Sequence, residues 1–205
     1  SIELRGRGFR EGKGNKMKTI LITGVCGVGK STITSELAQK LDCSWGDYAD
    51  VMLEIMGETD KDKIQYLNRN HKQNVINDTE KLIEKRFAEQ EDDHSLHLFE
   101  NHLSIIQNED IITFPLEDYQ RYNSIGLVVI EALASSILLR RQADNSRKRI
   151  LDTRELIEEQ QRINALEADK ISSLLHIPWI RVVNSDNIPP LNQLETWYLS
   201  LERQN

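Results

Sequence analysis

The sequence predicts a three-layer α/β fold in which helices cover both faces of a five-stranded parallel sheet. Two observations support this prediction. Short apolar runs typical of strands alternate five times with longer segments of helical periodicity, which is the pattern of a parallel sheet. A glycine-rich loop joins the first apolar run to the first helical segment, and ligands of such sheets bind beyond the carboxyl ends of the strands. We therefore expect residues 17–205 to form one domain with its binding site at that edge.

The five expected strands differ in how clearly the sequence marks them. The first is rich in β-branched residues, and the fourth is apolar almost throughout, as in a strand that is buried on both faces. The second, third and fifth are short apolar runs. In chain order, the strands are expected at about residues 18–23, 43–48, 95–99, 125–130 and 178–183.

The expected helices carry apolar residues at the spacing of one helical face. In the first helix, Ile33, Leu37 and Leu41 share a face, and in the last helix Leu194 and Leu201 do so. The helical segments are expected at residues 31–41, from about 50, over most of 64–90, at 133–141, at 152–176 and from 191.

Composition excludes several classes of protein. The 205 residues carry a net charge of -7, which argues against a general nucleic-acid binder or a membrane-surface protein. No apolar run approaches the length of a membrane span. Cys26 and Cys43 form no metal or redox pattern, and we expect both to be reduced thiols in a cytoplasmic protein.

The first residues differ from the rest of the chain. Residues 1–16 are rich in glycine, arginine and lysine and lack apolar periodicity, whereas Met17 opens the first expected strand. We expect this segment to be a tag or a disordered basic tail outside the domain. A basic arm that binds an acidic partner is the alternative.

The loop after the first strand, at residues 24–31, has the sequence GVCGVGKS and fits the pattern G-x-x-x-x-G-K-[ST] of a phosphate-binding loop. Its glycines let backbone N–H groups point inward, and the next helix directs its positive end to the same point. Lys30 can reach the β- and γ-phosphates of a nucleotide, and the Ser31 hydroxyl can bind Mg²⁺. The alternative, a plain glycine turn, has no need for this lysine and serine. The residues expected to hold the nucleotide are Gly24, Val25, Cys26, Gly27, Val28, Gly29, Lys30, Ser31 and Thr32.

Among proteins with such a loop, the rest of the sequence favours a phosphoryl-transfer enzyme. It has neither an N-K-x-D motif that reads guanine nor the glycine-rich signature of an ABC-type ATPase. A basic segment after the fourth strand suits a short arginine lid, because negative charge on the transferring group needs cations around it. Arg141, Arg147 and Arg149 are the expected catalytic cations. An ordinary solvated surface is the alternative for this segment.

From Met17 onward, the chain resembles the archaeal-type adenylate kinases, a family of P-loop kinases that transfer phosphate from ATP to AMP with Mg²⁺. The resemblance covers nearly the whole chain, and its motifs occur in family order. They are the loop and helix start GVCGVGKSTIT, residues 48–53, residues 99–102, residues 138–141 with Arg147 and Arg149, and residues 157–159 with Gln161 and Asn164.

The resemblance implies ATP and Mg²⁺ as cofactors, a nucleotide donor and a small phosphoryl acceptor as partners, and a homo-oligomer as a state that family members can adopt. It also implies that Lys30 is catalytic, that Ser31 binds Mg²⁺ and that Glu100 orients a metal-bound water. Asp50 and His102 would contact the acceptor. On the residues alone, Glu100 could instead make a local ion pair, His102 could pack under a loop, and Asp50 could cap the second helix.

The departures from the family gather on the acceptor side. Gln65 and Ala165 stand near positions where the family has arginine, and residues 108–115 replace a loop rich in glycine and proline. Arg69 and Arg162 are the residues expected to bind the acceptor phosphate instead. The resemblance indicates AMP or a related nucleoside monophosphate as acceptor. A kinase for another small molecule and an adenylate-kinase-like ATPase that acts as an assembly factor stay open as alternatives.

Overall fold

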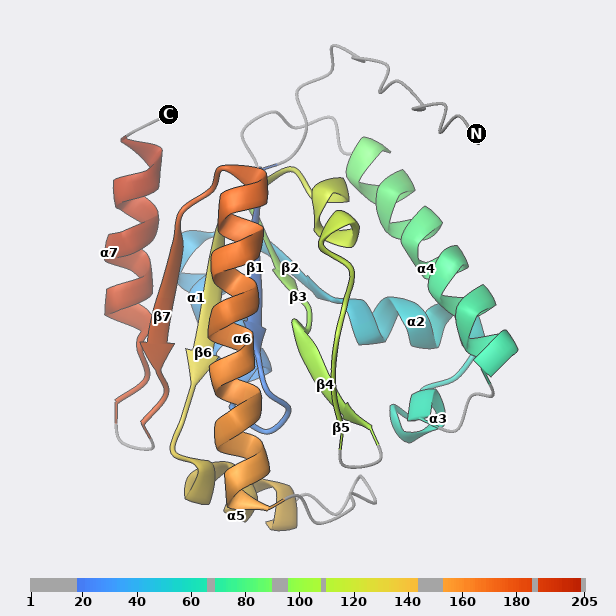
Figure 1. Cartoon of the computed structure of the whole chain (residues 1–205). Helices are drawn as coiled ribbons and strands as arrows, with labels where there is room; N and C mark the ends of the chain where they lie inside the picture. The colour runs from blue at the N-terminus through green and yellow to red at the C-terminus, as the bar shows by residue number, and fades with distance from the viewer. Residues whose placement is uncertain are drawn as a thin grey trace, which may run out of the picture.

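A computed structural model describes residues 18–65, 69–89, 96–107, 110–143, 153–185 and 188–203, so the expected tail at residues 1–16 lies outside the described part. The predicted sheet is confirmed. Five parallel strands pair in the order β2-β3-β1-β6-β7 (Figure 1). Each strand begins and ends within one residue of its predicted position. The strands are β1 (Lys18–Gly24), β2 (Ser44–Asp47), β3 (Leu96–Glu100), β6 (Ser124–Glu131) and β7 (Trp179–Val183).

Helices cover both faces of this sheet, as predicted. α1 (Lys30–Leu41) and α7 (Leu191–Glu202) lie on one face, and α6 (Arg154–Leu175) lies across the other, in front of the sheet in Figure 1. α2 (Tyr48–Met56) and α4 (Arg69–Glu89) pack together beside β2. The remaining helical elements are α3 (Asp62–Gln65), the 3-10 helix η1 (Leu116–Arg121) and α5 (Ala134–Ala143).

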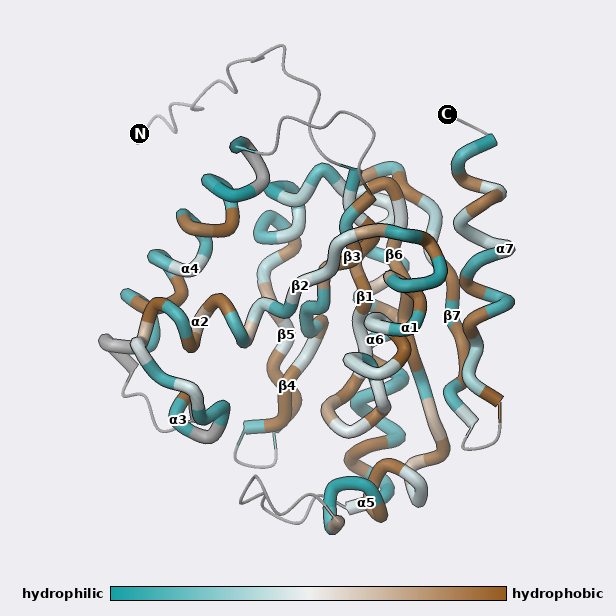
Figure 2. Tube along the Cα trace, turned by 180° about the vertical axis from the view of Figure 1, so that it is seen from behind, coloured by the Kyte–Doolittle hydropathy of each residue, from teal (hydrophilic) through white to brown (hydrophobic). Residues whose placement is uncertain are grey.

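The core has two halves because side chains of a strand alternate between the faces of the sheet. On β1, Ile20 and Ile22 point into the cluster that contains Ile33 and Leu37 of α1. Leu21, between them, points into the opposite cluster with residues of α6 such as Ile171. Both faces of the central strands are therefore buried, which explains why their sequences are largely apolar; Figure 2 shows this as brown tube along parts of β1, β3 and β6.

An antiparallel hairpin was not predicted, and neither was η1. β4 (Ser104–Gln107) and β5 (Asp110–Thr113) form an antiparallel hairpin outside the main sheet. β5 occupies residues 110–113 of the segment 108–115, which stands where the family has a loop rich in glycine and proline; residues 108 and 109 lie outside the described part. The missed signal is two isoleucine pairs, residues 105–106 and 111–112, which face each other in the hairpin register.

The sheet register determines where the site forms. Ile22 of β1 is paired with Glu100 of β3, and Glu100 is paired with Asp47 at the end of β2. Because all three strands run in the same direction, their carboxyl ends meet at one edge. The glycine loop that follows β1 is thus brought beside two carboxylates that are far apart in the sequence.

A separate finding concerns membranes. Within the described residues, no helix combines the length and the apolar character that crossing a bilayer requires.

We expect Ile171→Ala to lower the free energy of unfolding by about 2–5 kcal/mol, because it leaves a cavity between α6 and the sheet. Ile171 is 0% exposed. Leu166→Ala on the same helix is the control, since Leu166 is 46% exposed and its truncation should cost less than about 1 kcal/mol. Urea denaturation of both variants measures the difference. Equal losses would contradict the placement of α6 on the sheet.

Candidate functional site

The loop at residues 24–29 has the backbone shape that its glycines predict. Gly24, Gly27 and Gly29 have φ values of 149°, 82° and 96°, a region that side chains other than glycine rarely adopt. At Gly24, an added Cβ would also lie 2.5 Å from the carbonyl oxygen of Ile130. The path of the backbone therefore requires glycine at these positions.

Three side chains hold the carbonyl groups of this loop. Arg141 donates from Nε and Nη2 to the Cys26 oxygen, at 2.9 and 2.7 Å. Arg140 donates to the Val28 oxygen at 3.0 Å, and Asn184 donates to the same oxygen at 2.8 Å. These bonds connect the loop to α5 and to the end of β7. They stabilise the curled backbone directly before the N-terminus of α1, where an anion is favoured.

Lys30, the lysine of the motif, is buried at the start of α1. Its Nζ donates to the carbonyl oxygen of Gly24 at 2.9 Å. Burial lowers the pKa of Lys30, although the nearby Cys26, Glu100 and Asp47 oppose this shift. The ammonium therefore lies in a poorly solvated position, where its attraction to a phosphate is stronger than it would be in water.

Ser31 and Glu100 form the second polar contact of the site. The Ser31 hydroxyl donates to Glu100 Oε2 at 3.0 Å. Glu100 is only 2% exposed, and its Oε1 is buried without a hydrogen-bond partner in the described part of the chain. Burial raises the pKa of Glu100, although the charge of Lys30 opposes this shift.

This pair fits a magnesium ion that is bound together with a nucleotide. Hydroxyl and carboxylate oxygens are the ligands Mg²⁺ prefers, and the unsatisfied Oε1 can accept a hydrogen bond from a metal-bound water. Among the described residues, no group of three or more His, Cys, Asp or Glu side chains could hold a metal ion by itself. Phosphate and water oxygens would therefore have to complete the shell, as is usual for Mg²⁺.

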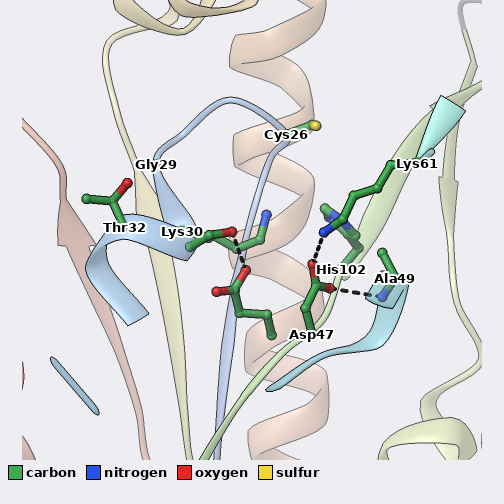
Figure 3. A pocket seen from close by; sticks show the side chains of 10 residues that line it. Cys26, Gly29, Lys30, Thr32, Asp47, Ala49, Lys61 and His102 are labelled. Atoms are coloured by element: carbon green, nitrogen blue, oxygen red, sulfur yellow. Dashed lines mark hydrogen bonds and ion pairs between the residues drawn. The ribbon is translucent and has the colours of Figure 1, made fainter. Parts of the chain in front are cut away.

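A cavity of about 190 Å³ lies beside the loop, and Figure 3 shows the side chains around it. Lys30 lies on one side of this view, and Lys61, Asp47 and His102 lie on the other. The cavity thus has a loop side, which suits the donor phosphates, and an opposite side formed after β2 and β3. Its lining residues are Cys26, Gly29, Lys30, Ser31, Thr32, Asp47, Ala49, Lys61, Glu100 and His102.

Lys61 was not among the predicted residues. Its Nζ lies 2.6 Å from Asp47 Oδ2 and 2.7 Å from Asp50 Oδ1. Burial alone would lower the pKa of Lys61, but the hydrogen bonds and charges of the two aspartates outweigh it, so the pKa is raised. Burial alone would raise the pKa of Asp47, but the hydrogen bond and the charge of Lys61 outweigh it, so the pKa of Asp47 is lowered. Both groups therefore stay charged near neutral pH.

Asp47 also corrects one expectation for Asp50. The Asp47 side chain accepts a hydrogen bond from Ala49 N at 2.9 Å, so Asp47 is the N-cap of α2 and the cap expected at Asp50 is wrong. Asp50 lies in the first turn of α2 and pairs with Lys61. The sequence contains a signal for this cap, because Asp47 directly precedes a helical segment and aspartate is a common N-cap residue.

The structure brings seven of the predicted site residues to this cavity. Cys26, Gly29, Lys30, Ser31, Thr32, Glu100 and His102 all line the cavity.

Of the predicted arginines whose side chains the structure describes, Arg141 and Arg162 are not among these lining residues. Arg141 binds the loop through the Cys26 oxygen. Arg162 is exposed on α6 and pairs with Glu159 at 2.6 Å, which does not support the expected contact with an acceptor. Arg69 begins α4, but its side chain lies outside the described part, as do Arg147 and Arg149 of the expected lid.

Comparisons of the sequence identify related proteins. The profile of the AAA domain family matches residues 23–158. The chain is 30% identical to the adenylate kinase of Thermococcus onnurineus over 164 residues, which are 77% of this chain and 80% of that protein. It is 26% identical to the adenylate kinase of Methanothermobacter thermautotrophicus over 184 residues, which are 88% and 95% of the two chains.

Two solved structures with a similar fold are shikimate kinases. Shikimate kinase from Acinetobacter baumannii, in complex with shikimate, superposes with a TM-score of 0.59 at 15% identity over 93% of this chain and 96% of that one. Shikimate kinase from Aquifex aeolicus gives 0.52 at 18% identity over 91% and 97%. At these identities the likeness shows the fold alone, which is the α/β fold of P-loop kinases.

We expect Glu100→Gln to raise the Mg²⁺ concentration that supports half-maximal ATP binding by about tenfold or more, because the amide cannot replace the charge of the carboxylate. Calorimetric titration of ATP at a series of Mg²⁺ concentrations measures this.

Protonation of Glu100 should have the same effect as Glu100→Gln. Because burial raises the pKa of Glu100, Mg²⁺-dependent binding should weaken on acidification at a pH above the ordinary glutamate value of 4.5. Glu100→Asp, which keeps a carboxylate, is the control. The same Mg²⁺ dependence for the wild type and the Gln variant would contradict the assignment.

Proposed function

As the chain belongs to the AAA domain family and to the archaeal-type adenylate kinase family of P-loop kinases, we propose that it transfers the γ-phosphoryl group of Mg-ATP to a small acceptor molecule. The observation that carries the proposal is the arrangement of Lys30, Ser31 and Glu100 around one cavity beside the glycine loop. This arrangement has a cation for the donor phosphates, oxygen ligands for a metal, and open space on the far side for a second substrate.

The residues of the loop side would act mainly by positioning and by charge. The loop N–H groups and Lys30 would hold the donor phosphates, and Ser31 with Glu100 would hold the oxygen shell of Mg²⁺. When bound, Mg²⁺ would offset negative charge on the phosphates. Arg141 would help by keeping the loop curled through Cys26, and we retain it with Arg147 and Arg149 as proposed cations for the migrating group. No strong general base is required, since phosphoryl transfer depends mostly on positioning and charge.

The family supports AMP or a related nucleoside monophosphate as the first acceptor to test. Two proteins from this family that are 26–30% identical to the chain are adenylate kinases. Asp50 and His102 would lie toward such an acceptor, since Asp50 pairs with Lys61 at the cavity and His102 lines it.

A second candidate is a kinase for a small molecule other than a nucleoside monophosphate. The observation that favours it is that the charge of Lys61 is shared by Asp47 and Asp50. Arg162, which was expected to bind an acceptor phosphate, pairs with Glu159 on an exposed surface.

We expect Lys30→Ala to reduce acceptor-dependent ADP formation by roughly 10³-fold, because a buried cation that faces the donor phosphates is lost. The far-ultraviolet circular dichroism spectrum and the unfolding midpoint should stay close to those of the wild type. Lys81→Ala removes an equal charge from an exposed position of α4 and should retain full activity. A coupled assay of ADP release with Mg-ATP and a panel of acceptors, beginning with AMP, makes the measurement.

Two results would contradict the proposal. One is unchanged phosphoryl transfer by Lys30→Ala. The other is ATP hydrolysis by the wild-type protein that no acceptor redirects into transfer, which would favour an ATPase that acts on a macromolecular assembly.

A further inference from the structure

We propose that Asp47, Lys61 and Asp50 form the acceptor-recognition site, and that this site selects an acceptor with neighbouring hydroxyl groups and no phosphate. We call the three residues the acceptor triad. The inference rests on the proposed phosphoryl transfer and specifies the chemical class of its acceptor, an uncharged polyhydroxylated small molecule.

The position of the triad is that of a second substrate. Asp47 and Lys61 line the same cavity as Lys30 and Ser31, on the side away from the loop (Figure 3). Lys61 is close enough to Lys30 that its charge contributes to lowering the pKa of Lys30. A molecule held by the triad would therefore lie next to the phosphates held by the loop. Binding both substrates in one cavity would favour direct transfer between them.

The hydrogen-bonding capacity of the triad matches a hydroxyl group. An ammonium has three N–H donors, and Asp47 and Asp50 accept two of those of Lys61. A carboxylate can accept about four hydrogen bonds, and Asp47 accepts from Ala49 N and from Lys61. Donor and acceptor capacity thus remain side by side. A hydroxyl group, which both donates and accepts, can use both, whereas a phosphate dianion offers acceptors only.

The net charge of the triad also favours an acceptor without a phosphate. One ammonium shared by two carboxylates leaves one net negative charge on this side of the cavity. A phosphate dianion would be repelled there, while an uncharged hydroxyl group would not be. The raised pKa of Lys61 and the lowered pKa of Asp47 mean that this ion pair persists at neutral pH.

A buried atom outside the triad also indicates a ligand in this cavity. Glu100 Oε1 has no hydrogen-bond partner within the described residues, and its side chain is almost fully buried. A buried carboxylate oxygen without a partner is costly, so a bound molecule or its water is expected to satisfy it. Glu100 pairs in register with Asp47, and both residues line the same cavity as Lys61.

The implied reaction transfers one phosphoryl group to the acceptor and releases one proton. An acceptor hydroxyl oxygen forms a bond to the γ-phosphorus of ATP, and the bond from that phosphorus to the oxygen bridging it to the β-phosphate breaks. The products are ADP and a phosphate monoester of the acceptor. The proton of the hydroxyl group is released to water.

The test uses the full chain with Mg-ATP and matched pairs of acceptors that differ by one phosphate: adenosine against AMP, and ribose against ribose 5-phosphate. We expect kcat/KM for the unphosphorylated member of at least one pair to be about tenfold or more higher, which corresponds to about 1.4 kcal/mol. Asp50→Asn, which neutralises the triad, should shift this ratio toward the phosphorylated member by a similar factor. Glu58→Gln makes the same charge change outside the triad and should leave the ratio unchanged.

The possible failures are distinguishable. If AMP is the better acceptor and Asp50→Asn leaves the ratio unchanged, the inference is overturned while the proposed transfer stands. If no acceptor of either kind raises ADP formation above hydrolysis, the proposed function fails, and the inference fails with it. The KM for ATP reports on the loop side, and a rise in it for Asp50→Asn would show a general defect in place of a change of acceptor preference.

Discussion

The parallel register at the carboxyl edge of the sheet is the constraint on which the site depends. Pairing of Ile22 with Glu100, and of Glu100 with Asp47, brings three strand ends to one level. The loop that follows β1 can then offer Lys30 and Ser31 to the two carboxylates. A shift of one residue in this register would turn these side chains to the other face of the sheet, so the continuous apolar strands that fix the register also fix the chemistry.

The two sides of the cavity are polar for different reasons. On the loop side, Lys30 and Glu100 are both buried. Burial lowers the pKa of Lys30 and raises the pKa of Glu100, so it disfavours the charged form of each. A charged ligand in contact with both residues would therefore stabilise their charged forms. On the far side, Lys61 already shares its charge with Asp47 and Asp50. The loop side is thus suited to phosphates and a metal ion, and the far side to neutral groups that exchange hydrogen bonds.

Much of the fold was predictable, because the signals for it are local. Five strands, most helices and the glycine loop follow from periodicity and from one motif of contiguous residues. The hairpin of β4 and β5 was not predicted, although its two isoleucine pairs signal short strands. Lys61 could not be found from sequence: it follows α2 in a polar segment, and only the fold brings its Nζ to Asp47. The same is true of Arg141, whose contact with Cys26 spans more than a hundred positions.

The central claim is that one cavity holds a phosphoryl donor on its loop side and an acceptor on the side of Asp47 and Lys61. Phosphorus-31 NMR of the full chain with Mg-ATP and an acceptor tests it most directly, because it identifies the product and not merely the loss of ATP. The account predicts a new phosphate monoester signal that grows in equal amount with ADP and is absent for Lys30→Ala. Growth of inorganic phosphate alone, with every acceptor unchanged, would contradict it.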